Sequence, residues 1–190
     1  MRIGLFGGSF DPVHLGHLLV AQAAREELEL TRLFFIPAAQ SPFKPERQPT
    51  EACERLRLLR LALAGKSWIE IDEQEVQRGG LSYTIDTLRD YATRFAGASL
   101  FYLIGADHVP QLLKWREAEA LARLADFVVI PRPGQAQTSL PVPFRGRHLE
   151  GFPLAISSSQ IRARIRAGQP IDHLVPRAVA EAIDNYRLYF

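Results

Sequence analysis

Two histidines, His14 and His17, follow closely on a pair of glycines near the start of the chain. The apolar run Ile3 to Phe6 reads as a buried strand that stops at Gly7-Gly8, where backbone freedom is greatest. The two histidines then stand where an amphipathic helix should begin. Free backbone N–H groups and the positive end of a helix dipole converge at such a turn, so it can bind phosphate. The stretch predicts a phosphate site with two imidazole rings beside it.

Three more polar side chains follow predicted strands at positions where a ligand can reach them. Asp107 comes just after the apolar run Leu100 to Gly105, and Arg132 follows another apolar run. Lys44 lies in a proline-rich loop, residues 37–49, after a third. Ligands of an open parallel sheet bind at the carboxyl ends of its strands, which favours substrate contacts for these residues. For Lys44 and Arg132, the alternative is an ordinary solvated side chain.

A run of three serines precedes a predicted helix, and Arg162 lies one turn further along it. Serine hydroxyls at a helix start can cap its free N–H groups. Together with an arginine, the same groups can bind the outer phosphates of a nucleotide. Simple capping is the alternative for the serines.

Residues 79–88, with the sequence GGLSYTIDTL, place polar side chains at the start of a helix that should end near Phe95. Thr84 and the nearby main chain can hydrogen-bond a carboxylate or the edge of an aromatic ring. The alternative is that Ser82 or Thr84 only caps this helix. Trp115 offers an indole face for stacking on an electron-poor ring, and a position in the core is its alternative.

Alternating strands and helices must position these groups. Helical periodicity predicts helices over residues 18–30, 50–64, 117–124 and 176–186, and a further helix that begins after Gly79-Gly80 and runs to about Phe95. Apolar runs predict strands over residues 3–6, 32–37, 68–72, 100–105 and 127–130, and a short strand that ends at Ile156. Strand, helix and strand within the first 37 residues form a βαβ unit with parallel pairing. We therefore expect an α/β fold in one domain, residues 1–190: a doubly wound, Rossmann-like, mostly parallel sheet with helices on both faces.

Two sets of charged residues are expected at the surface, and the cysteine inside. The charged sets are the arginines Arg55, Arg57 and Arg60, and the carboxylates Glu70, Asp72, Glu73 and Glu75. The arginines alternate with a leucine stripe, and the carboxylates fall on alternate faces of a strand or in a loop. Cys53 lies in a leucine-rich helical pattern, so we expect a buried structural thiol.

Composition restricts the class of protein. The 190 residues are 47% hydrophobic and carry a net charge of only +2, which suits a globular core and argues against nucleic acid as a partner. No apolar run approaches the ~18 residues needed to span a membrane, and the N-terminal run is too short for a signal peptide. A single cysteine fits reducing conditions. We expect a cytoplasmic protein without membrane contact, either a monomer or a small homo-oligomer.

The first stretch resembles the signature GGxFDPxHxGH of the nucleotidylyltransferase superfamily. The matching residues are Gly7, Gly8, Phe10, Asp11, Pro12, His14, Gly16 and His17. Three further stretches are similar to motifs of the nicotinate-nucleotide adenylyltransferase family: SYTIDTL from Ser82, Gly105-x-Asp107 with Trp115, and ISSSQIR from Ile156. In the last of these, Ser159 replaces the usual threonine and keeps the hydroxyl. Enzymes of this family transfer AMP from ATP to nicotinate mononucleotide and release pyrophosphate.

The resemblance implies a role for each residue singled out above. It assigns catalysis to His14, His17 and Arg162. It assigns ATP binding to Gly7, Gly8, Ser9, Phe10, Gly105, Asp107, Ser157, Ser158 and Ser159. It assigns substrate binding to Lys44, Ser82, Tyr83, Thr84, Trp115 and Arg132. ATP and nicotinate mononucleotide are the expected ligands, with Mg²⁺ held by phosphates and water rather than by a dedicated protein site.

Three alternatives remain at this point. One is another adenylyltransferase of the superfamily, with nicotinamide mononucleotide or phosphopantetheine as acceptor. Another is a metalloenzyme, since Asp11, His14 and His17 resemble a set of two histidines and one carboxylate. The last is a nucleotide sensor on the same fold that binds without turnover.

Overall fold

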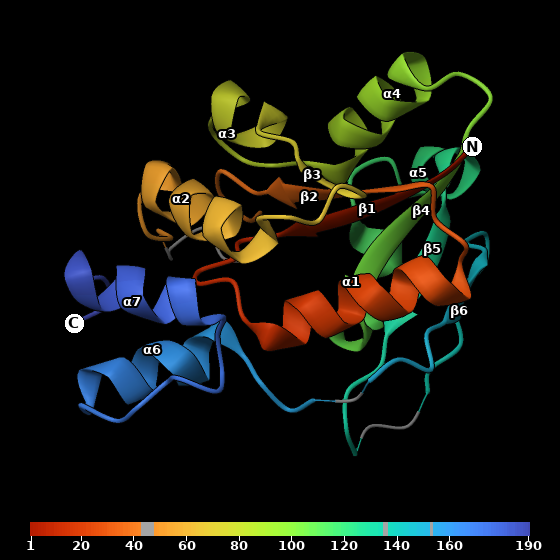
Figure 1. The fold of residues 1–190 in the computed structure, drawn as a ribbon. Helices are drawn as coiled ribbons and strands as arrows, with labels where there is room; N and C mark the ends of the chain where they lie inside the picture. The colour runs from red at the N-terminus through yellow and green to blue at the C-terminus, as the bar shows by residue number, and fades with distance from the viewer. Residues whose placement is uncertain (43–47, 135–136, 153) are drawn as a thin grey trace.

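The computed structural model describes residues 1–42, 48–134, 137–152 and 154–190. Its centre is a sheet of six parallel strands in the order β3-β2-β1-β4-β5-β6 (Figure 1). The strands are β1 (Arg2–Gly8), β2 (Arg32–Pro37), β3 (Ile69–Ile71), β4 (Ser99–Gly105), β5 (Asp126–Ile130) and β6 (Gly146–His148). The chain winds outward from β1 in one direction through β2 and β3, and in the other through β4 to β6. The strand order therefore reverses beside β1, which is where a sheet of this kind opens a ligand crevice.

Helices cover both faces of the sheet, as expected (Figure 1). One face carries α1 (Leu15–Glu27), α2 (Ala52–Leu63), α6 (Ser158–Arg166) and α7 (Arg177–Asn185). The other carries α4 (Thr84–Arg94), the 3₁₀ helix η1 (Ala106–Lys114) and α5 (Ala118–Leu124). A short helix, α3 (Gln74–Arg78), follows β3. The α/β, doubly wound, Rossmann-like prediction is confirmed, and the sheet is parallel throughout.

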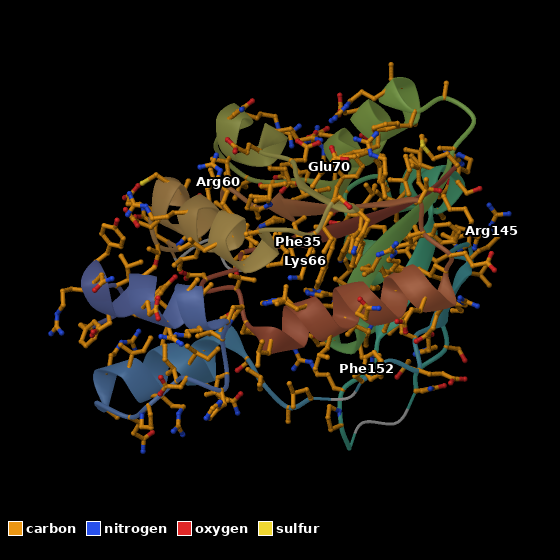
Figure 2. The ribbon with its side chains drawn as sticks, viewed as in Figure 1. Phe35, Arg60, Lys66, Glu70, Arg145 and Phe152 are labelled. Carbon is orange, nitrogen blue, oxygen red and sulfur yellow. The ribbon has the colours of Figure 1, made fainter. Side chains whose placement is uncertain are left out.

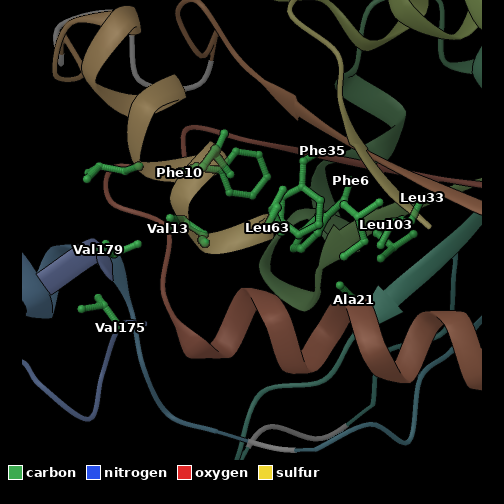
Figure 3. Packing of buried hydrophobic residues seen from close by; sticks show 14 of the residues in the cluster. Phe6, Phe10, Val13, Ala21, Leu33, Phe35, Leu63, Leu103, Val175 and Val179 are labelled. Carbon is green, nitrogen blue, oxygen red and sulfur yellow. The ribbon is translucent and has the colours of Figure 1, made fainter. Parts of the chain in front are cut away.

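Alternating apolar side chains divide the interior into two cores. Ile3 and Leu5 of β1 pack in the core beneath α4 and α5, whereas Phe6 packs beneath α1 and α2. Phe6 lies beside Phe35 of β2, to which it is also paired in the strand register (Figure 3). Burial on both faces explains why these strands are continuous apolar runs.

Several local predictions were wrong. β1 continues through Gly8 instead of stopping at the glycines. β6 was not predicted, because Gly146–His148 is short, polar and largely exposed. No strand ends at Ile156, where the chain is irregular. Cys53 is exposed, because it lies in the first turn of α2, ahead of the buried stripe.

The surface prediction for charged residues holds for Arg60, which is exposed, and for Glu70, which is partly exposed, whereas Phe35 is buried; Figure 2 labels all three. It fails for Arg55 and Glu75, whose exposed fractions are 1% and 4%. Tertiary contacts bury both, and each has polar partners described below. Within the described residues, no helix is long and apolar enough to cross a membrane.

Candidate active site

A cleft of about 1340 Å³ opens at the carboxyl edge of the sheet, where β1 and β4 meet the starts of α1, η1 and α6. Within the described residues, every predicted site residue lies on its wall. Lys44 falls outside the described residues. The topology brings together segments far apart in the sequence, because all the parallel strands end at this edge.

The turn between β1 and α1 forms the floor of the cleft. Phe10 has φ of +46°, in the left-handed region that a bulky residue rarely adopts. Its ring is buried between Phe6 and Phe35, at centroid distances of 5.5 and 5.1 Å. Aromatic packing therefore holds a backbone conformation that costs on the order of 1–3 kcal/mol in isolation.

The glycines of the turn are required by close contacts rather than by left-handed backbone. Neither Gly7 nor Gly8 has positive φ. A Cβ at Gly7 would lie 2.6 Å from the hydroxyl of Tyr102, and one at Gly8 would lie 3.1 Å from the ring of Phe10. The sequence predicts these glycines for their backbone freedom, whereas in the structure they are explained by the lack of space for a side chain.

His14 and His17 stack on each other at the start of α1, with ring centroids 3.6 Å apart and an interplanar angle of 27°. The backbone N–H of His14 donates to Nδ1 of His17 at 3.1 Å. Because Nδ1 accepts, the neutral ring of His17 carries its proton on Nε2 and can donate from there.

Burial keeps both rings neutral in the free protein. It lowers the pKa of His14 to about 4. Burial, and secondarily the neighbouring His14, lower the pKa of His17 well below its usual range. Two stacked imidazoles cannot both be charged cheaply, so this pair offers hydrogen-bond donors and is ready to gain positive charge only when an anion arrives.

The start of α6 is attached to the turn of β1 and α1. Ser157 caps the helix, accepting from the N–H of Gln160 at 3.3 Å. The hydroxyl of Ser158 donates to the carbonyl of Pro12 at 2.9 Å. The capping alternative for the serines is thus correct for Ser157, while the neighbouring Ser158 joins the two halves of the cleft.

Arg162 also faces this turn and is almost completely buried. Its guanidinium donates to the carbonyl of Asp11 and to the hydroxyl of Ser159, the latter at 3.1 Å. It lies 3.6 Å from the Asp11 carboxylate. Positive charge is therefore held beside the turn, close to where the serines begin α6.

The opposite wall is built from the loop before α4. The Ser82 hydroxyl accepts from the N–H of Ala39 at 2.9 Å, and the Thr84 hydroxyl lies 3.2 Å from that of Tyr102. Neither residue caps α4, whose N-cap is Tyr83. The capping alternative is therefore wrong here, because the Ser82 hydroxyl bonds the chain that follows β2 and the Thr84 hydroxyl contacts Tyr102 of β4.

Trp115 ends η1 and is partly buried on the same side. Its ring meets Tyr102 and His108 edge to face, with centroids 6.3 and 5.9 Å apart. It also lines the cleft. The indole therefore lies partly against the core and partly on the cleft wall, and its stacking on a ligand ring stays a prediction.

Asp107 and Arg132 leave neighbouring strands and form an ion pair of 3.1 Å at the mouth of the cleft. A Cβ at Gly105 would lie 2.6 Å from Oδ1 of Asp107, so glycine is needed for the aspartate to fold back. Both side chains are about half exposed, which leaves them accessible to a ligand.

Sequence reasoning missed Glu75 and Tyr102, which also line the cleft. Glu75 accepts from the hydroxyl of Thr87 at 2.6 Å, and burial raises its pKa. Tyr102 is itself buried within the continuous apolar run of β4, so no local signal separated it from the rest of the core.

A dedicated metal site is not found in the described part of the chain. No group of three or more histidines, cysteines or acidic residues there has the geometry to hold an ion. Asp11, His14 and His17, the set considered for a metalloenzyme, do not converge. Asp11 faces Arg162, while the two rings stack on each other.

Comparisons with known proteins identify relatives over the whole chain. Residues 5–164 match the family model described as cytidylyltransferase-like. A probable nicotinate-nucleotide adenylyltransferase of Thermus thermophilus is 42% identical over 189 residues, covering 100% of both chains. Its counterpart in Opitutus terrae is 40% identical over 192 residues, covering 100% of this chain and 98% of the relative.

Solved structures share the fold at lower identity. Nicotinic acid mononucleotide adenylyltransferase of Plasmodium falciparum, complexed with NaAD, has a TM-score of 0.83 at 21% identity, over 99% of this chain and 97% of that one. The same protein complexed with APC has a TM-score of 0.80 at 20% identity, over 99% and 96%.

Proposed function

The chain belongs to the cytidylyltransferase-like family and, within it, to the nicotinate-nucleotide adenylyltransferases, and we propose that its cleft carries out their reaction at the β1–α1 turn. The enzyme transfers AMP from ATP to nicotinate mononucleotide, giving deamido-NAD and pyrophosphate, a step of NAD biosynthesis. The observation that carries the assignment of the site is the stacked, neutral pair His14 and His17 on the cleft wall beside a turn of close-packed backbone.

The reaction needs little covalent chemistry from the protein. The acceptor phosphate attacks the α-phosphorus of ATP in line, and the bond to the β-phosphate oxygen breaks as pyrophosphate leaves. Charge grows on the α-phosphoryl and leaving oxygens, so preorganised donors lower the barrier. His17 can donate from Nε2, and we assign it and His14 to these oxygens. No residue acts as a nucleophile.

The two ends of ATP are assigned to different walls of the cleft. Ser157, Ser158 and Ser159 at the start of α6, with Arg162, face the leaving pyrophosphate. Gly105 and Asp107 lie at the carboxyl end of β4, where Asp107 can accept hydrogen bonds from ribose or adenine. Gly7, Gly8, Ser9 and Phe10 provide close backbone approach in between.

The acceptor is assigned to the wall formed by the loop before α4. The first N–H groups of α4 suit the carboxylate of nicotinate, because helix starts favour anions. Ser82, Tyr83 and Thr84 form that start, and Trp115 offers an indole for the pyridine ring. Arg132 reaches a phosphate when it leaves Asp107. Lys44 stays a prediction.

A divalent cation accompanies ATP in this family, and we assign Mg²⁺ to that role. The carboxylates of Asp107 and Glu75 are already partnered by Arg132 and Thr87, that of Asp11 is ion-paired with Arg162 at 3.6 Å, and no three acidic or histidine side chains of the described residues converge. The donor set of the described cleft therefore fits an ion carried mainly by phosphate oxygens and water. The ion supplies neutralisation of phosphate charge. A single domain, a cytoplasmic location and the state of monomer or small homo-oligomer stay predictions from the sequence.

The test is pyrophosphate release by the purified enzyme with ATP and one of three acceptors. Nicotinate mononucleotide should give the highest kcat/KM, nicotinamide mononucleotide a much lower value, and phosphopantetheine none above background. Comparable values for the acid and amide would remove the carboxylate-binding role of the α4 start. Nucleotide binding without turnover of any acceptor would favour a sensor.

A further inference from the structure

Arg55 is a charged side chain in the core that the mechanism above does not use. Its exposed fraction is 1%, and it is among the largest fully buried side chains of the described residues. It projects from the first turn of α2 toward the back of the β1–α1 turn. Its Nε donates to the carbonyl of Thr50 at 2.8 Å, and a terminal nitrogen donates to the carbonyl of Ser9 at 2.8 Å.

The contact with Ser9 determines which way the next peptide group points. The Ser9–Phe10 bond is not among the cis peptide bonds, and in a trans peptide the carbonyl and the following N–H point in opposite directions. Arg55 holds the Ser9 carbonyl toward α2, behind the turn. The N–H of Phe10 is therefore directed away from the Arg55 guanidinium, and both Ser9 and Phe10 line the cleft.

Three neighbouring carbonyls, those of Gly8, Asp11 and Pro12, also accept hydrogen bonds from protein donors. The Gly8 carbonyl accepts from the N–H of Ala38 at 2.9 Å. The Asp11 carbonyl accepts from Arg162, and the Pro12 carbonyl accepts from Ser158 at 2.9 Å. These carbonyl oxygens carry partial negative charge and would otherwise be able to repel a phosphate, but each accepts a hydrogen bond from the protein. Arg55 donates the hydrogen bond to the Ser9 carbonyl, next to Phe10 with its left-handed backbone.

The buried charge of Arg55 is offset by nearby acidic groups and by its own hydrogen bonds. Burial lowers the pKa of Arg55, while the Asp11 carboxylate and the nearby Tyr189 and Glu51 oppose that shift. Tyr189, near the C-terminus, is itself largely buried, and burial together with Asp11 raises its pKa. A buried cation with one acidic neighbour in the turn is costly unless its N–H groups are used. Two of them bond main-chain carbonyls from separate segments.

We propose that Arg55 is a positioning residue for AMP transfer, which holds the Ser9–Phe10 peptide so that the Phe10 N–H faces the reacting phosphates. The inference rests on the proposed function for its catalytic consequence. Its structural part, the direction of the Phe10 amide, is independent of which acceptor is used.

The kinetic test compares Arg55→Lys with two controls on α2. Lysine keeps the charge but cannot reach the Thr50 and Ser9 carbonyls with two nitrogens in a fixed plane. We expect kcat to fall at least tenfold, by analogy with loss of a preorganised donor, and KM for ATP to change less than about threefold. Arg57→Lys changes a partly exposed arginine of the same helix, and Leu63→Ala destabilises its far end. Both should keep kcat.

Amide hydrogen exchange distinguishes a positioning role from a purely structural one, because only the positioning role predicts a change confined to the turn. In Arg55→Lys, exchange should rise in residues 9–11 and stay unchanged in the strands and in α2. In the wild type, adding ATP with Mg²⁺ should slow exchange of the Phe10 amide, a measurement that needs no variant to fold.

Four outcomes decide the matter. An unchanged kcat in folded Arg55→Lys overturns the proposal, and so does a Phe10 amide that ATP leaves unaffected. A rise in exchange across the whole molecule, with kcat lost equally in Leu63→Ala, assigns Arg55 to stability alone and also overturns it. If the wild type binds ATP but transfers no AMP, the proposed function fails, while a slowed Phe10 amide still supports the predicted geometry.

Discussion

At the scale of single residues, the cleft depends on how two imidazoles share one small space. The N–H of His14 occupies Nδ1 of His17, which leaves Nε2 as the donor of that ring. Burial holds both rings neutral before substrate binds. Triphosphate would reverse this preference, because a nearby anion favours the protonated form. The pair can therefore respond to developing negative charge without being a permanent cation.

His17→Ala tests the donor role directly. We expect the variant to fold and its kcat to fall by roughly two decades or more, as for loss of one preorganised donor. Steady-state pyrophosphate release measures this. His173→Ala, which removes an exposed histidine, is the control and should retain full turnover. Turnover near that of the wild type in His17→Ala would remove the ring from the mechanism.

Gly16→Ala should separate activity from stability. The added Cβ would lie 3.0 Å from Nδ1 of His14, so the ring must shift. Gly16 lies in α1 and has no positive φ, so alanine adds helix propensity of up to about 1 kcal/mol, which offsets the cost of displacing the buried His14 ring. We expect lower kcat with little change in Tm.

Gln22→Ala, an exposed change on the same helix, is the control for Gly16→Ala and should keep kcat. Full activity in Gly16→Ala would mean that the position of the His14 ring has no influence on transfer.

At the scale of elements, the acceptor wall depends on a buried connection between two helices. Glu75 of α3 accepts from the hydroxyl of Thr87 on α4 at 2.6 Å, and both are buried. Ser82, in the loop between these helices, is attached to the chain after β2. The start of α4 is thus positioned by hydrogen bonds rather than by its own cap.

Thr87→Val removes the hydroxyl and keeps the shape. We expect a loss of about 1–3 kcal/mol in the free energy of unfolding, because a buried acceptor loses its donor. KM for nicotinate mononucleotide should rise more than KM for ATP. Urea denaturation and initial rates measure the two effects.

Thr93→Val on the same helix is the matched control for Thr87→Val. Its hydroxyl is exposed and bonds only to the helix carbonyl of Arg89, so the change should cost less than about 0.5 kcal/mol. Equal losses in the two variants would show that the contact with Glu75 does not stabilise the wall.

At the scale of the whole molecule, the reversal of strand order beside β1 creates the cleft. Folding also buries His14 there, which keeps its ring neutral and makes the free energy of unfolding depend on pH. The unfolded chain binds a proton at His14 near pH 6.5, whereas the folded protein does so near pH 4. Between pH 6.5 and 4 the unfolded chain binds a proton at His14 that the folded protein does not. The free energy of unfolding is therefore highest, with respect to this group, above pH 6.5, and it decreases as the pH falls toward 4.

His14→Gln tests this linkage, because glutamine cannot be protonated. Between pH 6.5 and 4, the wild type should lose up to about 3 kcal/mol more unfolding free energy than the variant. Carboxylates titrate in both proteins, so the difference reports His14 together with its effect on the pKa of His17. Urea denaturation without ligand at several pH values measures it, and parallel pH curves for the two proteins would contradict the shift in pKa.

The sequence by itself determined the strands β1 to β5, the helices α1, α2 and α4 to α7, the parallel sheet and the stretches that line the cleft, but it missed β6, α3 and η1. Its apolar runs and glycine-rich turn carry that information locally, and the residues of the motifs follow strand ends. Because parallel strands end at one edge, those stretches had to meet. The chemistry of His14, His17 and Arg162 was likewise foreseeable as a hypothesis, and their roles stay proposals.

Only the tertiary structure decided which charged groups are buried and why the glycines are needed. Arg55 lies in the same helix as the exposed Arg60, and Glu75 follows the partly exposed Glu70 and Glu73, so local pattern could not separate them. The left-handed conformation of Phe10 depends on aromatic rings from other strands. Burial, strain and lack of space at a glycine arise from contacts between segments distant in the chain, and no local pattern records them.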